Sequence, residues 1–189
     1  MSNWSTAFNW VMDNEDRGRN YASVPDAPGE YQLDANGNLV LDNHGHKIWQ
    51  GAFAISGINS AAYPVQYQQI NSLPQPARGP AIEGFYKTYF WSTSLDAVTS
   101  DEVAKRVFDA EVNMGQSTGV KILQKALGFD PEDCDGKWGP HTVSACNSAV
   151  EASLVPAFIA ARVQHYEDII ALKPVDAKYR DVWEARAKK

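Results

Sequence analysis

Glu15 stands at the end of an apolar stripe, a position where a charged side chain is unexpected. Four apolar residues recur at helical spacing near the start of the chain: Trp4, Phe8, Val11 and Met12. This spacing places them on one side of a helix. Because each residue turns a helix by about 100°, Glu15 falls on the same side, nearly above Phe8. The pattern sets a carboxyl group against apolar neighbours.

Two interpretations of Glu15 follow. In the first, the helix is slightly rotated and Glu15 is an exposed residue of its last turn. In the second, Glu15 is a desolvated carboxyl group on the wall of a cleft, where burial and the negative end of the helix dipole would both raise its pKa. A carboxyl group that keeps its proton near neutral pH can protonate a glycosidic oxygen. The second interpretation predicts the general acid of a glycosidase.

Two short patterns are similar to metal ligands but do not predict a metal site. His44 and His46 flank one residue near a strand, and such pairs without a carboxylate cluster are usually surface residues. Asp133 and Asp135 match part of a calcium loop whose other ligands are missing. A turn before a helix that begins at Pro140 is the better interpretation of this segment. We expect no metal and no cofactor.

Cys134 and Cys146 can form a disulfide or remain buried thiols. Thiols are favoured, because the N-terminus shows no recognisable secretory signal and disulfides are rare in the cytosol. A zinc site is rejected, since His141 between the two cysteines is poorly placed to complete it.

The composition of the 189 residues is that of a soluble globular protein with one substantial domain, or a domain with a small companion. The net charge is −6 and no Lys/Arg-rich run occurs, so nucleic-acid binding is not expected. No run approaches 18 apolar residues, so membrane insertion is not expected either. Six Trp, eight Tyr and seven Phe exceed the usual need of such a core, and some are expected to line a groove, as in carbohydrate-binding clefts.

The elements that must position Glu15 are mostly helical. The first helix is predicted to cover about residues 4–16 and to stop near Gly18. Residues 19–62 lack helical periodicity, and the turn dipeptides Asn36-Gly37 and His44-Gly45 predict a β-hairpin at about residues 30–52. Further helices are predicted for about residues 64–73, 80–91, between a Thr99/Glu102 capping box and Gly115, 117–127, from Pro140, 153–172, and around 179–186. The class is mainly α with one small β element.

Several stretches of the chain occur in the order found in a known family: NEDRGRNYASVPDAPG, AISGINSAAYP, FYKTYFW, VFDAEVNMGQSTGVKILQKALGF, DGKWGPHTVSAC and YRDVWEAR. Together they resemble the glycoside hydrolase family 108 lysozyme-like muramidases, which have a C-terminal peptidoglycan-binding-type region. That family includes proteins named secretion activators and some phage endolysins. The resemblance runs from about Phe8 to Arg186, is interrupted by the hairpin segment, and is more specific in its second half.

The resemblance implies a mainly α, lysozyme-like helical fold with a small β-hairpin element. Residues 1–95 would form an N-terminal catalytic lobe, and residues 96–189 a C-terminal helical peptidoglycan-binding-type region packed with it as one compact unit. The implied function is that of an N-acetylmuramidase, which cleaves the β-1,4 bond between N-acetylmuramic acid and N-acetylglucosamine in peptidoglycan. The alternative is a non-catalytic peptidoglycan-binding or structural module derived from the same family.

The partner expected from this function is the glycan strand of peptidoglycan, bound by a monomer. Without a recognisable secretory signal, the protein is expected to be made in the cytoplasm. It would act in the periplasm or cell wall after release through a holin or a dedicated export route.

The catalytic residues carry over from the family by motif. The family's catalytic glutamate, in a Glu-Gly-Gly motif after the first helix, matches Glu15, with Asp16 and Arg17 in place of the glycines. Asp26 is the best match for the family's aspartate, as a base or a water-orienting group, and a turn-capping carboxylate is the alternative. Where the family has a threonine, Ser56 is the nearest hydroxyl, which would orient water or be an ordinary turn residue.

Three further residues are candidate substrate ligands. Asn59 and Asn113 supply amides, and Asn113 is either a ligand or a satisfied buried amide. Trp91 either stacks on a sugar or belongs to the core. Because the hairpin lies between the two predicted catalytic stretches, we expect it beside the cleft, with Tyr31 or Trp49 near the substrate.

Overall fold

A computed structural model describes residues 3–189, apart from the side chains of residues 27–30. The chain divides into two compact units: unit 1 consists of Met1–Asn14 and Tyr86–Lys189, and unit 2 of Glu15–Phe85. The sequence predicts a division at residues 95 and 96. In the structure the first helix instead groups with the C-terminal part, because the ring of Trp4 packs against those of Trp91 and Phe108, with centroids 5.2 and 5.6 Å apart.

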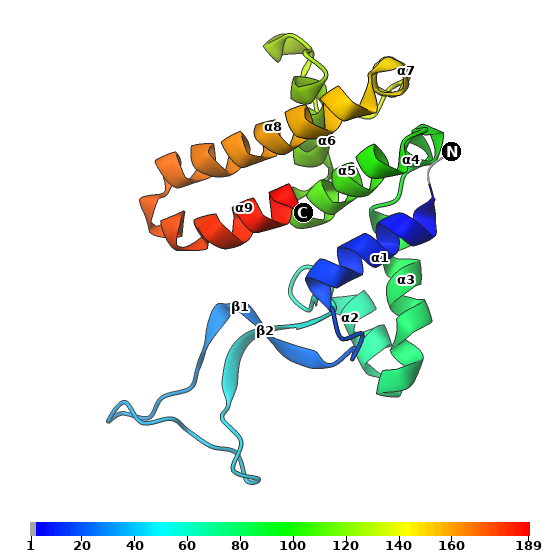
Figure 1. The fold of residues 1–189 in the computed structure, drawn as a ribbon. Helices are drawn as coiled ribbons and strands as arrows, with labels where there is room; N and C mark the ends of the chain where they lie inside the picture. Colours follow the sequence, from blue (N-terminus) through cyan, green and yellow to red (C-terminus); the bar gives the residue numbers. More distant parts are fainter. Residues whose placement is uncertain (1–2) are drawn as a thin grey trace. The chain divides into compact units, whose positions relative to one another are not determined.

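Unit 1 is built from helices. They are α1 (Trp4–Glu15), which ends at the unit boundary, α4 (Thr93–Ala97), α5 (Asp101–Met114), α6 (Gln116–Ala126), α7 (Pro140–Ser148), α8 (Glu151–Leu172) and α9 (Arg180–Lys188), with short 3-10 helices at Pro131–Asp133 and Pro174–Tyr179. Helix α8 packs against α5, α6 and α9 (Figure 1). Phe108, Leu123 and Phe158 are buried in this unit. Burying each such side chain contributes roughly 1.5–3 kcal/mol.

Unit 2 combines a small sheet with helices. The strands are β1 (Ser23–Tyr31), β2 (Trp49–Ile55) and β3 (Ile58–Asn59), antiparallel and in the order β1-β2-β3. They are followed by α2 (Pro64–Asn71), a 3-10 turn (Gln75–Ala77) and α3 (Arg78–Tyr89), whose last residues belong to unit 1. Ile55, Ile58, Ile70 and Ile82 are buried. The mainly α class with a small β element is confirmed.

The starts of α5 and α3 differ from the prediction, and one further helix was not predicted. The N-cap of α5 is Ser100, whose hydroxyl accepts the backbone N–H of Val103, so the capping box predicted at Thr99 is wrong by one residue. Helix α3 begins at Arg78, because Pro80 falls in its first turn, where a missing N–H has no consequence. Helix α4 was not predicted, since a segment of five residues is too short to show apolar periodicity.

The predicted hairpin at residues 30–52 is present and contains a tandem repeat. The two copies are LDANGNLV (33–40) and LDNHGHKI (41–48). In each copy the aspartate, Asp34 or Asp42, accepts the backbone N–H groups two and four residues further on, at 2.8 and 2.9 Å. These N–H groups lower the pKa of both aspartates. Both turn dipeptides therefore lie in turns, as predicted.

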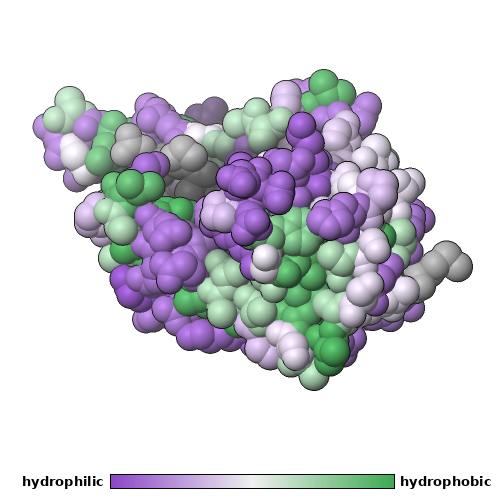
Figure 2. Space-filling view, turned by 90° about the horizontal axis from the view of Figure 1, so that it is seen from above, coloured by the Kyte–Doolittle hydropathy of each residue, from purple (hydrophilic) through white to green (hydrophobic). Residues whose placement is uncertain are grey.

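Apolar surface does not by itself mark a functional site in this protein. Val150, Leu172 and Val175 are all exposed, and the face drawn in Figure 2 has an apolar patch (green) bordered by hydrophilic residues (purple). Exposed apolar atoms are normal on folded proteins. None of the described helices has both the length and the apolar character needed to cross a membrane. Polar contacts between specific residues are the better guide to a functional site in this protein.

Candidate functional site

Asp16, the residue after Glu15, is the centre of a set of hydrogen bonds in unit 2. Its Oδ2 accepts the hydroxyl of Ser56 at 2.8 Å and the backbone N–H of Tyr21 at 2.9 Å. Its Oδ1 accepts the backbone N–H of Asn20 at 3.3 Å. The side chain closes the loop that follows α1 and joins this loop to the turn after β2.

The loop after α1 contains two residues in the left-handed backbone region. The angle φ is 50° at Arg19 and 54° at Tyr21, a conformation that costs a residue with a side chain about 1 kcal/mol or more. The Arg19 guanidinium donates to the carbonyl of Asp16 at 3.0 Å, and that of Arg78 donates to the carbonyl of Tyr21 at 2.9 Å. Strained backbone held by this many contacts is typical of functional loops.

Ser56 occupies the first position of the two-residue turn that joins β2 and β3. Ile55 pairs with Ile58 across this turn, and φ is positive at both turn residues, 47° at Ser56 and 80° at Gly57. Such turns belong to type I′, in which Asn or Gly usually fills the first position. Ser56 is only 5% exposed and donates its hydroxyl to Asp16. The turn does not require serine, and the serine hydroxyl supplies the donor that contacts Asp16.

Asp26 lies where the pairing of β1 and β2 becomes irregular. The register shifts between Pro25 and Gly29, and extra residues at such a bulge re-aim the side chains. The Asp26 Oδ2 accepts the side-chain amide of Asn59 at 2.7 Å. The Asn59 Oδ1 in turn accepts two backbone N–H groups, at 2.7 and 3.1 Å, which orients its NH₂ group toward Asp26. The structure brings Asp26 and Asn59 together as one pair.

Glu15 is the half-buried last residue of α1. The apolar stripe before it is present: Val11 and Met12 are fully buried, and the rings of Trp4 and Phe8 stack with centroids 5.3 Å apart. Glu15 is therefore neither an exposed residue, as the first interpretation from the sequence predicts, nor a fully desolvated carboxyl group, as the second predicts.

Unit 2 contains four of the six predicted site residues, and the other two lie in unit 1. The four are Glu15, Asp26, Ser56 and Asn59. Asn113 is exposed near the end of α5, so it is not a buried amide, and its Oδ1 accepts the hydroxyl of Tyr166 at 2.7 Å.

Trp91 is 8% exposed and packs in the aromatic cluster of unit 1. Its indole N–H donates to Asp96 at 2.8 Å. A side chain this buried has little surface with which to stack on a sugar. Its environment supports the alternative given with the sequence, a core aromatic.

Tyr31 and Trp49 form an aromatic pair at the base of the hairpin. They are opposite one another in the β1–β2 register, and their rings meet edge to face with centroids 5.1 Å apart. The Trp49 indole N–H donates to the carbonyl of Ala52 at 2.8 Å. Tyr31 is 39% exposed, so the pair offers aromatic surface to a ligand.

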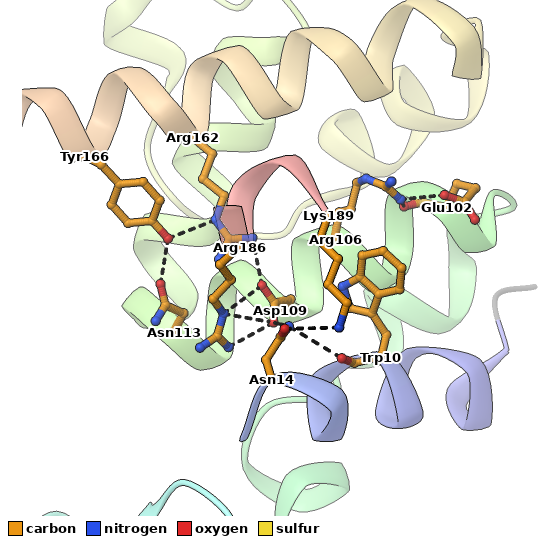
Figure 3. Close-up of polar contacts among 10 residues, drawn as sticks. All are labelled: Trp10, Asn14, Glu102, Arg106, Asp109, Asn113, Arg162, Tyr166, Arg186 and Lys189. Carbon is orange, nitrogen blue, oxygen red and sulfur yellow. Dashed lines mark hydrogen bonds and ion pairs between the residues drawn. The ribbon is translucent and has the colours of Figure 1, made fainter. Parts of the chain in front are cut away.

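Unit 1 contains a buried charge network around Asp109 (Figure 3). Asp109 is fully buried and forms ion pairs with Arg162 at 2.7 Å and with Arg186 at 2.9 Å. Burial alone favours the neutral carboxyl group, but the charges of Arg186 and Arg162 hold the pKa of Asp109 below its usual range. The network joins α5, α8 and α9.

Helix α1 is tied to the same network through Asn14. The Asn14 amide donates to the Asp109 Oδ1 at 2.9 Å, and its oxygen accepts the Lys189 ammonium at 3.1 Å (Figure 3). Asn14 directly precedes Glu15 in α1. The network therefore fixes the end of the helix that carries the predicted acid.

Glu111 is a second buried carboxyl group in unit 1, and no pattern in the sequence marks it. Its Oε1 accepts the indole N–H of Trp138 at 2.6 Å, and its Oε2 has no hydrogen-bond partner in the described part of the chain. Burial raises its pKa to about 8. Because Glu111 is 0% exposed, it cannot touch a polymeric substrate. The hydrogen bond that Glu111 accepts from Trp138 fixes the orientation of that indole ring.

The side chains of the types that commonly bind metal ions are not grouped into a metal site in the described residues. In the part of the chain that the structure describes, no three His, Cys, Asp or Glu side chains are grouped so as to hold a metal ion. Asp135 caps a turn, accepting the backbone N–H of Lys137 at 2.9 Å, as its turn interpretation predicts. Cys134 and Cys146 are free and buried, and burial raises the pKa of Cys146 to about 11.

Comparisons with known proteins bear on the second half of the chain and on the fold. Residues 118–188 match the family model described as a predicted peptidoglycan domain. Among solved structures, the chain is similar to Brucella abortus SagA, with a TM-score of 0.62 and 18% identity, over 98% of this chain and 89% of that chain. This similarity confirms the mainly α, lysozyme-like fold class. No curated protein matches the sequence.

Proposed function

We propose that this protein is a peptidoglycan hydrolase, an N-acetylmuramidase of the glycoside hydrolase family 108 type. The observation that carries the proposal is a half-buried glutamate at a helix end, Glu15, in one unit with a second carboxylate, Asp26, that an amide holds in place. The match of residues 118–188 to a predicted peptidoglycan domain supports the substrate class. The enzyme would act on the cell wall or in the periplasm.

In the proposed reaction Glu15 is the general acid. It donates its proton to the oxygen of the β-1,4 bond between N-acetylmuramic acid and N-acetylglucosamine as the bond to the anomeric carbon breaks. Its position after Asn14 gives the carboxyl group a fixed helix end to project from, because the Asp109 network holds that residue. Preorganised geometry of this kind is what a general acid needs.

Asp26 is the proposed base. Water adds to the anomeric carbon and loses one proton to the Asp26 carboxylate, so the proton that Glu15 gives up is balanced by the one that Asp26 receives. The amide of Asn59 fixes the Asp26 Oδ2 at 2.7 Å. We propose that Asn59 acts by orienting this carboxylate. Asn113, in unit 1, stays a separate candidate ligand for the glycan.

A second candidate function is peptidoglycan binding without catalysis. It is favoured by the extent of the family match, which covers residues 118–188 and none of the proposed catalytic residues. This alternative predicts that the protein sediments with peptidoglycan but does not solubilise it.

The two functions are separated by comparing turbidity and sedimentation of purified peptidoglycan with wild-type protein and two variants. Glu15→Gln removes the transferable proton but keeps the shape of the side chain, so the rate of clearing should fall by at least about 10²–10⁴-fold while binding persists. Glu83→Gln, at an exposed glutamate of the same unit, is the control and should clear at the wild-type rate. Binding without clearing by the wild-type protein would instead establish the second function.

A further inference from the structure

The contact between Asp16 and Ser56 fixes how the serine hydroxyl can be used. The hydroxyl donates to the Asp16 Oδ2 at 2.8 Å. A hydroxyl has one proton to donate and can still accept hydrogen bonds. Toward any further partner, the Ser56 oxygen is therefore an acceptor.

The backbone at Ser56 shows that the turn itself does not favour a serine at this position. At φ 47° a residue with a side chain is disfavoured relative to glycine. The neighbouring turn residue is already glycine, and Asn or Gly would suit the first position better. The hydroxyl is instead buried against a carboxylate that directly follows Glu15.

Asp16 has no freedom to turn away from Ser56. Its two oxygens also accept the backbone N–H groups of Tyr21, at 2.9 Å, and Asn20, at 3.3 Å. Three donors converge on one carboxylate, and such charge-assisted hydrogen bonds are stronger than neutral ones. The carboxylate is held as a fixed acceptor for the serine proton.

We infer that Asp16 is a positioning residue for the hydrolysis, acting through Ser56; this inference rests on the proposed function. Ser56 accepts a hydrogen bond from one O–H of the attacking water, and that proton stays on the water oxygen. The other proton passes to Asp26 as the oxygen bonds to the anomeric carbon, while the Glu15 proton goes to the leaving oxygen. Because the Ser56 proton is donated to Asp16, it does not point toward the water. The Ser56 oxygen can therefore accept the hydrogen bond from the water.

The test uses two substitutions that separate stability from turnover. Ser56→Gly removes the hydroxyl and its hydrogen bond to Asp16 but relieves the left-handed backbone. Because these two effects on the free energy of unfolding oppose one another, the protein should stay folded, with a urea midpoint close to that of wild type. Its kcat should nevertheless fall on the order of 10²-fold, with KM nearly unchanged, because the water is no longer oriented. Ser60→Ala is the matched control: the Ser60 hydroxyl accepts the backbone N–H of Phe53 at 2.9 Å, so this variant should lose stability but keep kcat.

Asp16→Asn tests the route through the serine. Either orientation of the new amide places its NH₂ group against a donor, on the side of Ser56 and Tyr21 or on the side of Asn20. The kcat should fall as in Ser56→Gly, and the double variant should be no slower than the slower single variant, because both substitutions remove the same interaction. Additive losses in the double variant, or wild-type kcat in Ser56→Gly, would overturn the inference.

Failure of this inference can be told from failure of the proposed function. If wild-type protein releases glycan fragments and Glu15→Gln does not, the proposed function stands. Wild-type kcat in Ser56→Gly would then reject the positioning role alone. If wild-type protein releases no fragments, both the proposed function and the positioning role of Asp16 are rejected.

Discussion

Replacing the buried Glu111 by glutamine should change how the stability of the protein depends on pH. Glu111 is 0% exposed, and burial raises its pKa from an ordinary 4.5 to about 8. The packing around it is tight, since a Cβ on Gly119 would lie 2.7 Å from the Glu111 Cγ. The folded protein therefore holds this carboxyl group neutral over a pH range in which the unfolded chain ionises it.

The sign and size of the effect follow from linkage. As the pH rises from 4.5 to 8, the unfolded chain releases the Glu111 proton and the folded protein does not, so the free energy of unfolding falls. A tenfold difference in proton affinity is worth about 1.4 kcal/mol, so the loss contributed by this group between pH 5 and pH 8 is about 3 kcal/mol. Glu111→Gln abolishes this contribution, because an amide does not titrate in that range.

Urea unfolding at pH 5, 6.5 and 8 measures the effect. The amide keeps an oxygen for the indole N–H of Trp138 but buries an extra donor, which costs about 1–3 kcal/mol at every pH. The informative quantity is therefore the difference between pH 5 and pH 8, which should be about 3 kcal/mol smaller in Glu111→Gln than in wild type. Glu132→Gln, at an exposed glutamate, should follow wild type. Parallel curves for wild type and Glu111→Gln would refute the reasoning.

Three further predictions concern the rest of the molecule. Asp109→Asn leaves the buried Arg162 and the half-buried Arg186 without their counter-charge and should lower the free energy of unfolding by roughly 3–5 kcal/mol. Asn14→Ala should lower it by about 1 kcal/mol in the same denaturation assay, and equal losses would be inconsistent with the network. Replacing residues 32–48 by a short Gly/Ser bridge should reduce turnover without unfolding the helices seen by circular dichroism, and unchanged turnover would make the hairpin dispensable. Cys134 and Cys146 should react with a thiol reagent only in denaturant, and rapid labelling of the native protein would contradict their burial.

The helices could largely be predicted from the sequence because their signals are local. Apolar periodicity and terminal glycines indicated α5, α6 and α8 to within a few residues. The cap of α5 could not be assigned, since Thr99 and Ser100 are adjacent hydroxyls and only the folded protein shows which one accepts the helix N–H. The side chain of Thr99 instead contacts Asn147, 48 residues away.

The site was predictable only where a residue carries its own local signal. Glu15 stood out because its helix has an apolar stripe, while the partner of Asp16 is 40 residues away and the Arg186 that contacts Asp109 is 77 residues away. Such pairs depend on tertiary structure, which no spacing in the sequence reveals. Trp91 has no such signal. A tryptophan can pack in a hydrophobic core or stack on a sugar, and the sequence does not separate these two roles.

Mass spectrometry of the fragments released from peptidoglycan tests the central claim most directly. The account predicts that wild-type protein releases fragments with N-acetylmuramic acid at the reducing end, and that Glu15→Gln, folded as judged by circular dichroism, releases at least about 10²-fold less. Fragments ending in N-acetylglucosamine or in an anhydro sugar would contradict the proposed bond or reaction, and undiminished release by Glu15→Gln would contradict the assignment of Glu15 as the acid.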